Sequence, residues 1–395
     1  MFHRLNRDET ERYLTDRAAK GFTVIQAVAL AELDGVTVPN AQGHLPLIKE
    51  DLHHPDVKGG PDNDYWDEAE WVIALAATKG LYVGLLPMWG KPCPADPSSC
   101  ERCGRFIGER FQAHLNLIWI LGGDRPARTK NEQDCWRAMA KGITLGVSGR
   151  EDDATELMTY HTFGPDTSAN YFHDDAWLDF NGIQSSHGNA ILNRNRVEQD
   201  HQRRPVKPVI DLETSYPGIG LNKMPPGNED HARRSAYWAV FSGACGHTYG
   251  ANSIWQLYAP GRKPLFGAKL SWSEALDASS AAQMGYLRRL IESHPFLTQA
   301  PDTSLLAEPP ADPVEHIAAL RGDGYVLVYT PTGMPFRVRC EKLEGKRVRA
   351  SWFDPRTGKS SDADQFRREG EREFTPPGQP GPGNDWVLVL ENPGR

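Results

Sequence analysis

Short apolar runs alternate with amphipathic stretches over the first three quarters of the chain. The apolar runs predict strands at 22–29, 81–86, 117–121, 157–161, 182–187, 206–212 and 246–254. Apolar positions at helical spacing predict helices at 6–20, 64–79, 101–114, 131–146, 189–201, 228–243 and 281–291. We expect Asn6 and Asn131 to cap the helices that they open. Seven strands alternating with helices, at about 30 residues per unit, are typical of parallel βαβ architecture.

Beyond Pro301 the pattern changes to short β-prone runs separated by turn sequences. These runs lie at 316–320, 325–329, 336–339, 348–352 and 386–390. They predict a small antiparallel β-sandwich. A chain of 395 residues fits a barrel of about 250 residues plus such a module. We therefore expect two domains, at 1–297 and 298–395.

The clearest strand ends at two glycines and a carboxylate. Leu117 to Leu121 form an apolar run typical of a strand that is buried on both faces. Gly122 and Gly123 then allow a tight turn that places Asp124 at the carboxyl end of the strand. Catalytic groups of α/β barrels lie at that end. The alternative is that Asp124 caps the following helix.

A second carboxylate, Glu213, also follows a strongly apolar strand. It lies 89 residues after Asp124 (213 − 124), which is three βα units at about 30 residues each. In an eight-stranded barrel, strands three steps apart can present their side chains to one substrate. Two carboxylates so placed can hydrolyse a glycosidic bond. The alternative is that Glu213 is a solvated loop residue.

Rings gather at the same predicted rim. Sugars stack their C–H faces on aromatic rings, and their hydroxyls require polar partners. Candidates at or just after strand ends are Trp89, His161, His187, Tyr216, Trp255 and Tyr258. Each alone is compatible with ordinary packing, but as a set they favour a carbohydrate-binding cleft.

Charge and apolar content exclude two classes of partner. The formal net charge of −8 argues against nucleic acid. No apolar run approaches the 18 residues of a membrane span. Met1 to Asn6 lack the apolar core of a signal peptide, so the chain as written is expected in the cytoplasm. The oligomeric state stays open.

Six cysteines raise the question of a metal site. Cys100 and Cys103 form a CxxC motif near Cys93, but a second CxxC or a nearby histidine pair is missing. Free thiols in a reducing compartment are therefore the preferred interpretation. We expect no metal and no cofactor.

Several segments resemble the apiosidase-like glycoside hydrolases. In the first domain they are 116–124, 20–26, Pro39-Asn40, and 208–213 with Tyr216 and Gly218. In the tail they are 325–333, 352–358 and 385–390, which are similar to the small C-terminal domain that these proteins carry and that is often labelled as collagen-binding. The resemblance covers nearly the whole chain and implies a (β/α)8 barrel.

The resemblance also implies an activity. Asp124 would be the acid/base and Glu213 the nucleophile of a retaining reaction, and Asn40 joins the rings as a substrate-binding residue. The characterised activity of the family is removal of apiose-linked chains from the pectin rhamnogalacturonan II. The expected function is thus hydrolysis of a plant or bacterial polysaccharide, and the resemblance implies apiose-containing pectin as a substrate.

The N-terminus departs from the family pattern. Family members begin with a strand ending in a Gly-Asp-Thr-Ala-Trp-like segment, whereas this chain starts just past it. We therefore expect a barrel without its first strand, or a true start upstream that would carry an export signal and place the protein outside the cytoplasm. Three rival functions remain: a glycosidase with another substrate, a non-catalytic carbohydrate-binding protein, and a matrix-binding protein.

Overall fold

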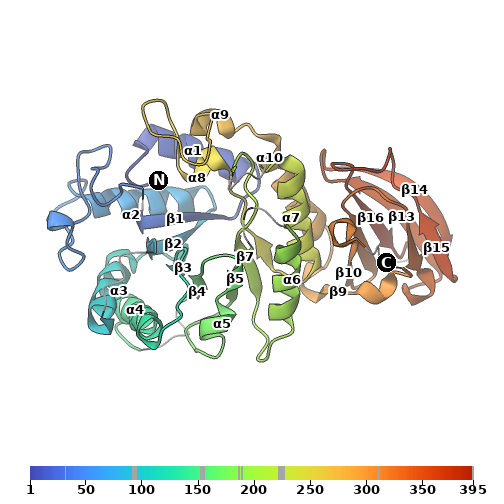
Figure 1. Ribbon diagram of the computed structural model, residues 1–395, viewed down its shortest axis with the longest axis horizontal. Coiled ribbons are helices and arrows are strands. Elements are labelled where there is room, and N and C mark those ends of the chain that lie inside the picture. The colour runs from blue at the N-terminus through green and yellow to red at the C-terminus, as the bar shows by residue number, and fades with distance from the viewer. Residues whose placement is uncertain are drawn as a thin grey trace. The chain divides into compact units, whose positions relative to one another are not determined.

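A computed structural model (Figure 1) describes residues 1–31, 33–90, 96–151, 156–185, 187, 190–220, 227–308 and 312–393. Its internal contacts divide the chain into two compact units. The first comprises residues 1–184, 203–208 and 253–276, and the second comprises residues 185–202, 209–252 and 277–395. Within the described ranges, every helix is too short or too polar to cross a membrane.

The first unit is built on a parallel sheet with the strand order β1-β2-β3-β4. These strands are Val24–Leu30, Tyr82–Met88, Leu117–Gly122 and Met158–His161. The helices between them, with the N-terminal helix first, are α1 (Arg7–Ala19), α2 (Tyr65–Thr78), α3 (Pro97–Phe111) and α4 (Lys130–Ser148). The strands lie where the apolar runs predicted them, because each run is buried under helices.

The first residues of α1 and α4 can be compared with the predicted N-caps, Asn6 and Asn131. Asn6 caps α1 as expected, since its side chain accepts from the Glu9 N–H and Glu9 reciprocates. The predicted cap of α4 was wrong. Thr129 holds that position, because Thr129 and Glu132 form the same reciprocal pair and thereby place Asn131 inside the helix.

Helices α3 and α4 pack side by side at unusually close range (Figure 1). A Cβ added to any of four glycines would lie 2.1–2.4 Å from a carbonyl oxygen of the partner helix. These glycines form two G-x-x-x-G pairs, Gly104 with Gly108 and Gly142 with Gly146. The missing side chains let the backbones of these two helices touch, and the helices precede and follow β3 in the chain.

The rest of the first unit follows β4. It contains β5 (Asp166–Thr167), which pairs antiparallel with β6 (Asn181–Gln184), and the short helices α5 (Ala169–Phe172) and α9 (Trp272–Ala275).

The prediction of a strand over 246–254 was largely wrong. Only β8 (Gly246–His247) forms, and α8 (Asn252–Trp255) follows. Beyond β8 the Thr248 N–H still donates to the Asp211 carbonyl, whereas the Asn252 N–H donates to the Pro217 carbonyl.

The second unit contains α6 (Ala190–His201), β7 (Val209–Glu213), α7 (Glu229–Phe241), β8 and α10 (Ser279–Glu292). Strands β7 and β8 are parallel, with Asp211 opposite His247. Short 3-10 turns elsewhere in the chain span Ile48–Glu50, Phe296–Thr298, Thr303–Leu305, Pro313–Glu315 and Cys340–Lys342.

The C-terminal part of this unit is antiparallel, as predicted. A six-stranded sheet has the order β14-β13-β16-β11-β10-β9. In that order its strands are Lys359–Arg367, Arg347–Asp354, Trp386–Glu391, Tyr325–Thr330, Ala318–Gly322 and Ala300–Pro301. A two-stranded sheet pairs β12 (Phe336–Arg339) with β15 (Glu371–Phe374). The apolar pattern missed β14, because every residue of that strand except Phe366 is exposed.

Strands β16, β11 and β10 of the six-stranded sheet are buried on both faces. One face, with Val328 and Leu388, forms the core shared with the two-stranded sheet. The other face, with Leu327 and Val389, packs against α7 and α10. A buried ion pair between Arg233 of α7 and Asp385 joins the same elements, with an N–O distance of 2.7 Å. The C-terminal sheets therefore share a core with helices that lie before them in the chain.

Candidate active site

Asp124 lies just past the C-terminal end of β3, in backbone that only glycines make possible. Gly122 and Gly123 have φ values of 90° and 105°, and Asp124 itself has φ of 44°. A Cβ on Gly122 would lie 2.2 Å from the His161 carbonyl, and one on Gly123 would lie 2.8 Å from the Trp89 ring. Asp124 is not a helix cap, since α4 begins at Lys130. Left-handed backbone at a non-glycine residue is typical of functional sites.

Replacing Gly122 by alanine should destabilise the first unit and displace Asp124. The left-handed backbone costs a Cβ roughly 1–2 kcal/mol, and overlap with the His161 carbonyl adds about 1–3 kcal/mol. Gly149→Ala is the matched control, because Gly149 is also left-handed (φ 71°) but an added Cβ meets nothing within 4 Å. Urea denaturation should show the larger loss for Gly122→Ala. Equal losses for both variants would contradict the steric argument.

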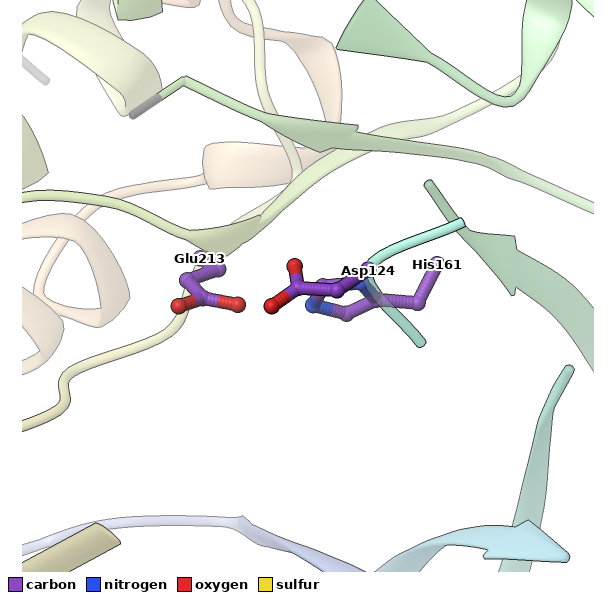
Figure 2. Close-up of side chains that lie close together, drawn as sticks. All are labelled: Asp124, His161 and Glu213. Atoms are coloured by element: carbon purple, nitrogen blue, oxygen red, sulfur yellow. The ribbon is translucent and has the colours of Figure 1, made fainter. Parts of the chain in front are cut away.

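Two of the predicted rings lie beside Asp124. A carboxylate oxygen of Asp124 and a ring nitrogen of His161 lie within 4.8 Å of each other (Figure 2). His161 is fully buried, and its Nδ1 lies 3.0 Å from the Thr162 carbonyl. The Trp89 ring packs on the imidazole with centroids 4.9 Å apart. The first unit thus gathers an acid, an imidazole and an indole at the ends of β2, β3 and β4.

Glu213, the last residue of β7, is buried (labelled in Figure 2). Its Oε1 lies 3.0 Å from Nε2 of His187. Nδ1 of the same imidazole lies 2.9 Å from the Thr214 carbonyl, and the Tyr216 ring lies 4.7 Å away between centroids. Glu213 is therefore not a solvated loop acid. Within the second unit it forms a cluster with His187 and Tyr216.

A third acid, Asp211, lies behind Glu213 on the same strand. Its Oδ2 accepts hydrogen bonds from Ser185 Oγ, at 2.9 Å, and from the Asn193 amide. Ser185 also donates its N–H to the Glu213 carbonyl at 2.9 Å. Burial raises the pKa of Asp211 to about 7. The sequence analysis missed this residue, although a lone acid inside the apolar run 206–212 was a usable signal.

Asparagine at position 211 should change how stability depends on pH. Since burial raises the pKa of Asp211 from 3.8 to about 7, the folded protein keeps a proton that the unfolded chain has lost over this range. That stabilisation is complete below about pH 4 and is lost as the pH rises to about 7. The free energy of unfolding of Asp211→Asn, relative to that of the unmodified protein, should therefore increase by a few kcal/mol as the pH rises through this window. One pKa unit corresponds to about 1.4 kcal/mol.

Urea denaturation of both proteins at pH 5 and pH 8 measures this difference. Asp277→Asn, at an exposed aspartate, is the control for a simple change of net charge. A constant difference between Asp211→Asn and the unmodified protein at both pH values would mean that Asp211 is ionised throughout.

The remaining predicted residues lie in the first unit. Asn40 is buried, and its Oδ1 accepts from the N–H groups of Gln42 and His44 at 3.1 and 2.9 Å. Its Nδ2 has no hydrogen-bond partner within the described part of the chain. Trp255 and Tyr258 are half-buried after β8, and the Trp255 ring lies 6.1 Å from that of Phe266. Asn40 thus organises its own loop and keeps one amide donor.

Both cysteines of the CxxC motif, Cys100 and Cys103, are buried. Cys103, Cys245 and Cys340 carry free thiols. Burial raises the pKa of the Cys103 thiol to about 12, so this thiol is protonated at neutral pH. Cys93 lies outside the described residues.

Comparisons with known proteins cover the whole chain. A family model described as "Apiosidase-like, catalytic domain" matches residues 1–298, and one described as "Putative collagen-binding domain of a collagenase" matches residues 300–391. A solved structure titled "Glycoside hydrolase" is 33% identical, with a TM-score of 0.92 over 100% of this chain and 91% of its own. A glycoside hydrolase family 5 structure from Bacteroides vulgatus is 32% identical, with a TM-score of 0.92 over 100% and 87%.

More distant similarity concerns the fold alone. A GH30 endoxylanase from Clostridium papyrosolvens is 10% identical, with a TM-score of 0.53 over 96% of this chain and 92% of its own. No curated protein matches. The fold is therefore the (β/α)8-type barrel with a C-terminal β-sandwich that the sequence predicted.

Proposed function

Given that this chain belongs to the apiosidase-like family and is a glycoside hydrolase, we propose that it hydrolyses a plant or bacterial polysaccharide with retention, and that apiose-containing pectin is its substrate. The observation that carries the proposal is the position of Asp124 and Glu213. Asp124 lies two residues past the end of β3, and Glu213 is the last residue of β7. Barrel enzymes place catalytic groups at this end of their parallel strands.

In this proposal the two acids have different tasks. Glu213 attacks the anomeric carbon as a carboxylate, while Asp124 gives its proton to the departing glycosidic oxygen. The result is a glycosyl ester on Glu213. Water then attacks the same carbon, passes a proton to Asp124 and releases Glu213 as a carboxylate. Two inversions at one carbon give net retention.

The sugar would be held by the predicted rings and by Asn40. Trp89, Trp255 and Tyr258 are only partly buried and can stack on C–H faces. The Nδ2 group of Asn40 suits a sugar hydroxyl. A buried amide without a hydrogen-bond partner carries a cost in free energy, and a bound hydroxyl would remove that cost. His161 and Tyr216 complete the proposed set of substrate-binding residues.

A panel of pectic and other plant polysaccharides tests the substrate. Rhamnogalacturonan II should release product, and the double variant Asp124→Asn/Glu213→Gln should not. Added methanol should yield a methyl glycoside, because a covalent intermediate can be intercepted by an alcohol. Hydrolysis without methyl glycoside would favour an inverting reaction. Activity on another polysaccharide alone would reassign the substrate.

The same assay tests whether a metal takes part. Asp124, His161 and Glu213 are of residue types that also bind metal ions. The proposed reaction, however, requires only proton transfer and a nucleophile. Activity should therefore survive incubation with EDTA. Loss of activity that zinc or another divalent ion restores would contradict the proposed reaction. If no substrate is hydrolysed, the alternative function as a carbohydrate- or matrix-binding protein is favoured.

A further inference from the structure

We propose that His187 is the positioning residue of Glu213, holding the nucleophile by a shared proton instead of contacting the sugar. The inference deepens the proposed function and rests on it. It concerns a side chain that the sequence analysis placed among substrate-binding residues. Four contacts within the second unit carry the argument.

The first contact determines which ring nitrogen carries hydrogen. Nδ1 of His187 lies 2.9 Å from the Thr214 carbonyl oxygen. A carbonyl can only accept a hydrogen bond, so Nδ1 must donate and must be protonated. The neutral tautomer with its proton on Nε2 is thereby excluded. If the ring is neutral, Nε2 is left with a bare lone pair.

The second contact then requires another proton. Nε2 lies 3.0 Å from Oε1 of Glu213, which is hydrogen-bond distance between two atoms that would both present lone pairs if His187 were neutral and Glu213 ionised. One proton must therefore lie between them. Imidazole is roughly a hundredfold more basic than a glutamate carboxylate. The proton accordingly belongs on Nε2, as an imidazolium facing a carboxylate.

The remaining contacts fix the imidazole in place. Ser215 Oγ donates to the His187 carbonyl at 3.1 Å, and the Tyr216 ring packs on the imidazole with a tilt of 59°. His187 is thus attached to the three residues that follow Glu213 as well as to the carboxylate itself. Rotating the ring away would break the bonds to Thr214 and Glu213 together, so the carboxylate has one preferred orientation.

This arrangement suits a nucleophile that must also leave. When Glu213 forms its bond to the anomeric carbon, it loses negative charge, and when that bond breaks, the charge returns. A fixed imidazolium stabilises the returning carboxylate without giving up its proton. The proton stays on Nε2 through both steps, and the protons that move are those at Asp124, which gives one to the departing oxygen and later accepts one from water.

Nitrogen NMR tests the shared proton without any substrate. The full chain labelled with ¹⁵N-histidine contains 13 histidines, and the signals that disappear in His187→Gln identify His187. At pH 7.5 an ordinary imidazole is about nine-tenths neutral. We expect His187 to be protonated on both nitrogens in the unmodified protein, and on Nδ1 alone in Glu213→Gln.

Kinetics on the hydrolysed polysaccharide test the positioning role. His187→Gln should lower kcat about 10- to 100-fold and leave KM within about twofold, since the imidazole acts through Glu213. A histidine that binds sugar would instead raise KM. His54→Gln is the control, because His54 lies exposed in the loop before α2, and it should behave like the unmodified protein.

Three results would overturn the proposal. They are a neutral His187 in the unmodified protein, an imidazolium that persists in Glu213→Gln, and unchanged kcat in His187→Gln. The NMR result stands apart from the activity. If no polysaccharide is hydrolysed but His187 loses its second proton in Glu213→Gln, then the shared proton is supported and the proposed function alone fails.

Discussion

Glutamine at position 213 should reduce kcat on the natural polysaccharide by about 10⁴-fold or more. The amide is a poor nucleophile and cannot form the glycosyl ester that the retaining reaction requires. Losses of this size are typical when a nucleophile is removed from a set of residues that act together. Steady-state rates from reducing-end release measure the effect. Because glutamine has nearly the same size, far-UV circular dichroism and the melting temperature should change little.

Glycine at the same position provides a sharper version of this test. Glu213→Gly opens space for a small anion, so azide should restore turnover and give a glycosyl azide of inverted configuration. That product requires attack from the face that Glu213 would have used. Residual activity above about a tenth of that of the unmodified protein would exclude Glu213 as nucleophile. Loss of activity without rescue, in a folded variant, would favour an inverting role.

The periodic segments were predictable because burial repeats in the sequence. The strand that ends at Gly122 is apolar because it is buried from Trp119 onward, and its position follows directly from that pattern. Asn6 is a readable cap because Glu9 stands at the reciprocal position. Asp124 and Glu213 became candidates for one reason, since each carboxylate stands at the end of an apolar run.

Other features depend on contacts between segments distant in the chain. Strand β14 forms on a neighbour and carries almost no apolar residues, so no pattern marks it. The segment 248–254 was predicted as part of a strand, yet Asn252 opens helix α8 and donates its N–H to the Pro217 carbonyl. His187 looked like a sugar contact at a strand end. Only its distances to Thr214 and Glu213 reveal another task.

Asparagine at position 124 should produce a defect whose size depends on the leaving group. For the natural polysaccharide, whose departing oxygen needs a proton, we expect kcat/KM to fall by about 10²- to 10⁴-fold. For an aryl glycoside with an acidic phenol, departure needs no proton, so formation of the glycosyl ester should stay fast. Its hydrolysis should be slow, because Asp124 is also the base that activates water.

A burst of phenol followed by slow turnover is therefore the expected time course for Asp124→Asn with the aryl substrate. Mass spectrometry of the quenched protein should find the sugar on the peptide that contains Glu213. Equal losses on both substrates, with no burst, would contradict the acid/base role of Asp124.

The choice of asparagine in this experiment follows from the backbone. Asp124 has φ of 44°, a region that asparagine and aspartate tolerate better than other side chains with a Cβ. Alanine would remove the carboxylate and also strain the turn, as Gly122→Ala does two residues earlier. Asp124→Asn keeps the turn, so a defect that follows leaving-group acidity reports proton transfer alone, whereas Asp124→Ala should add a loss that is common to every substrate.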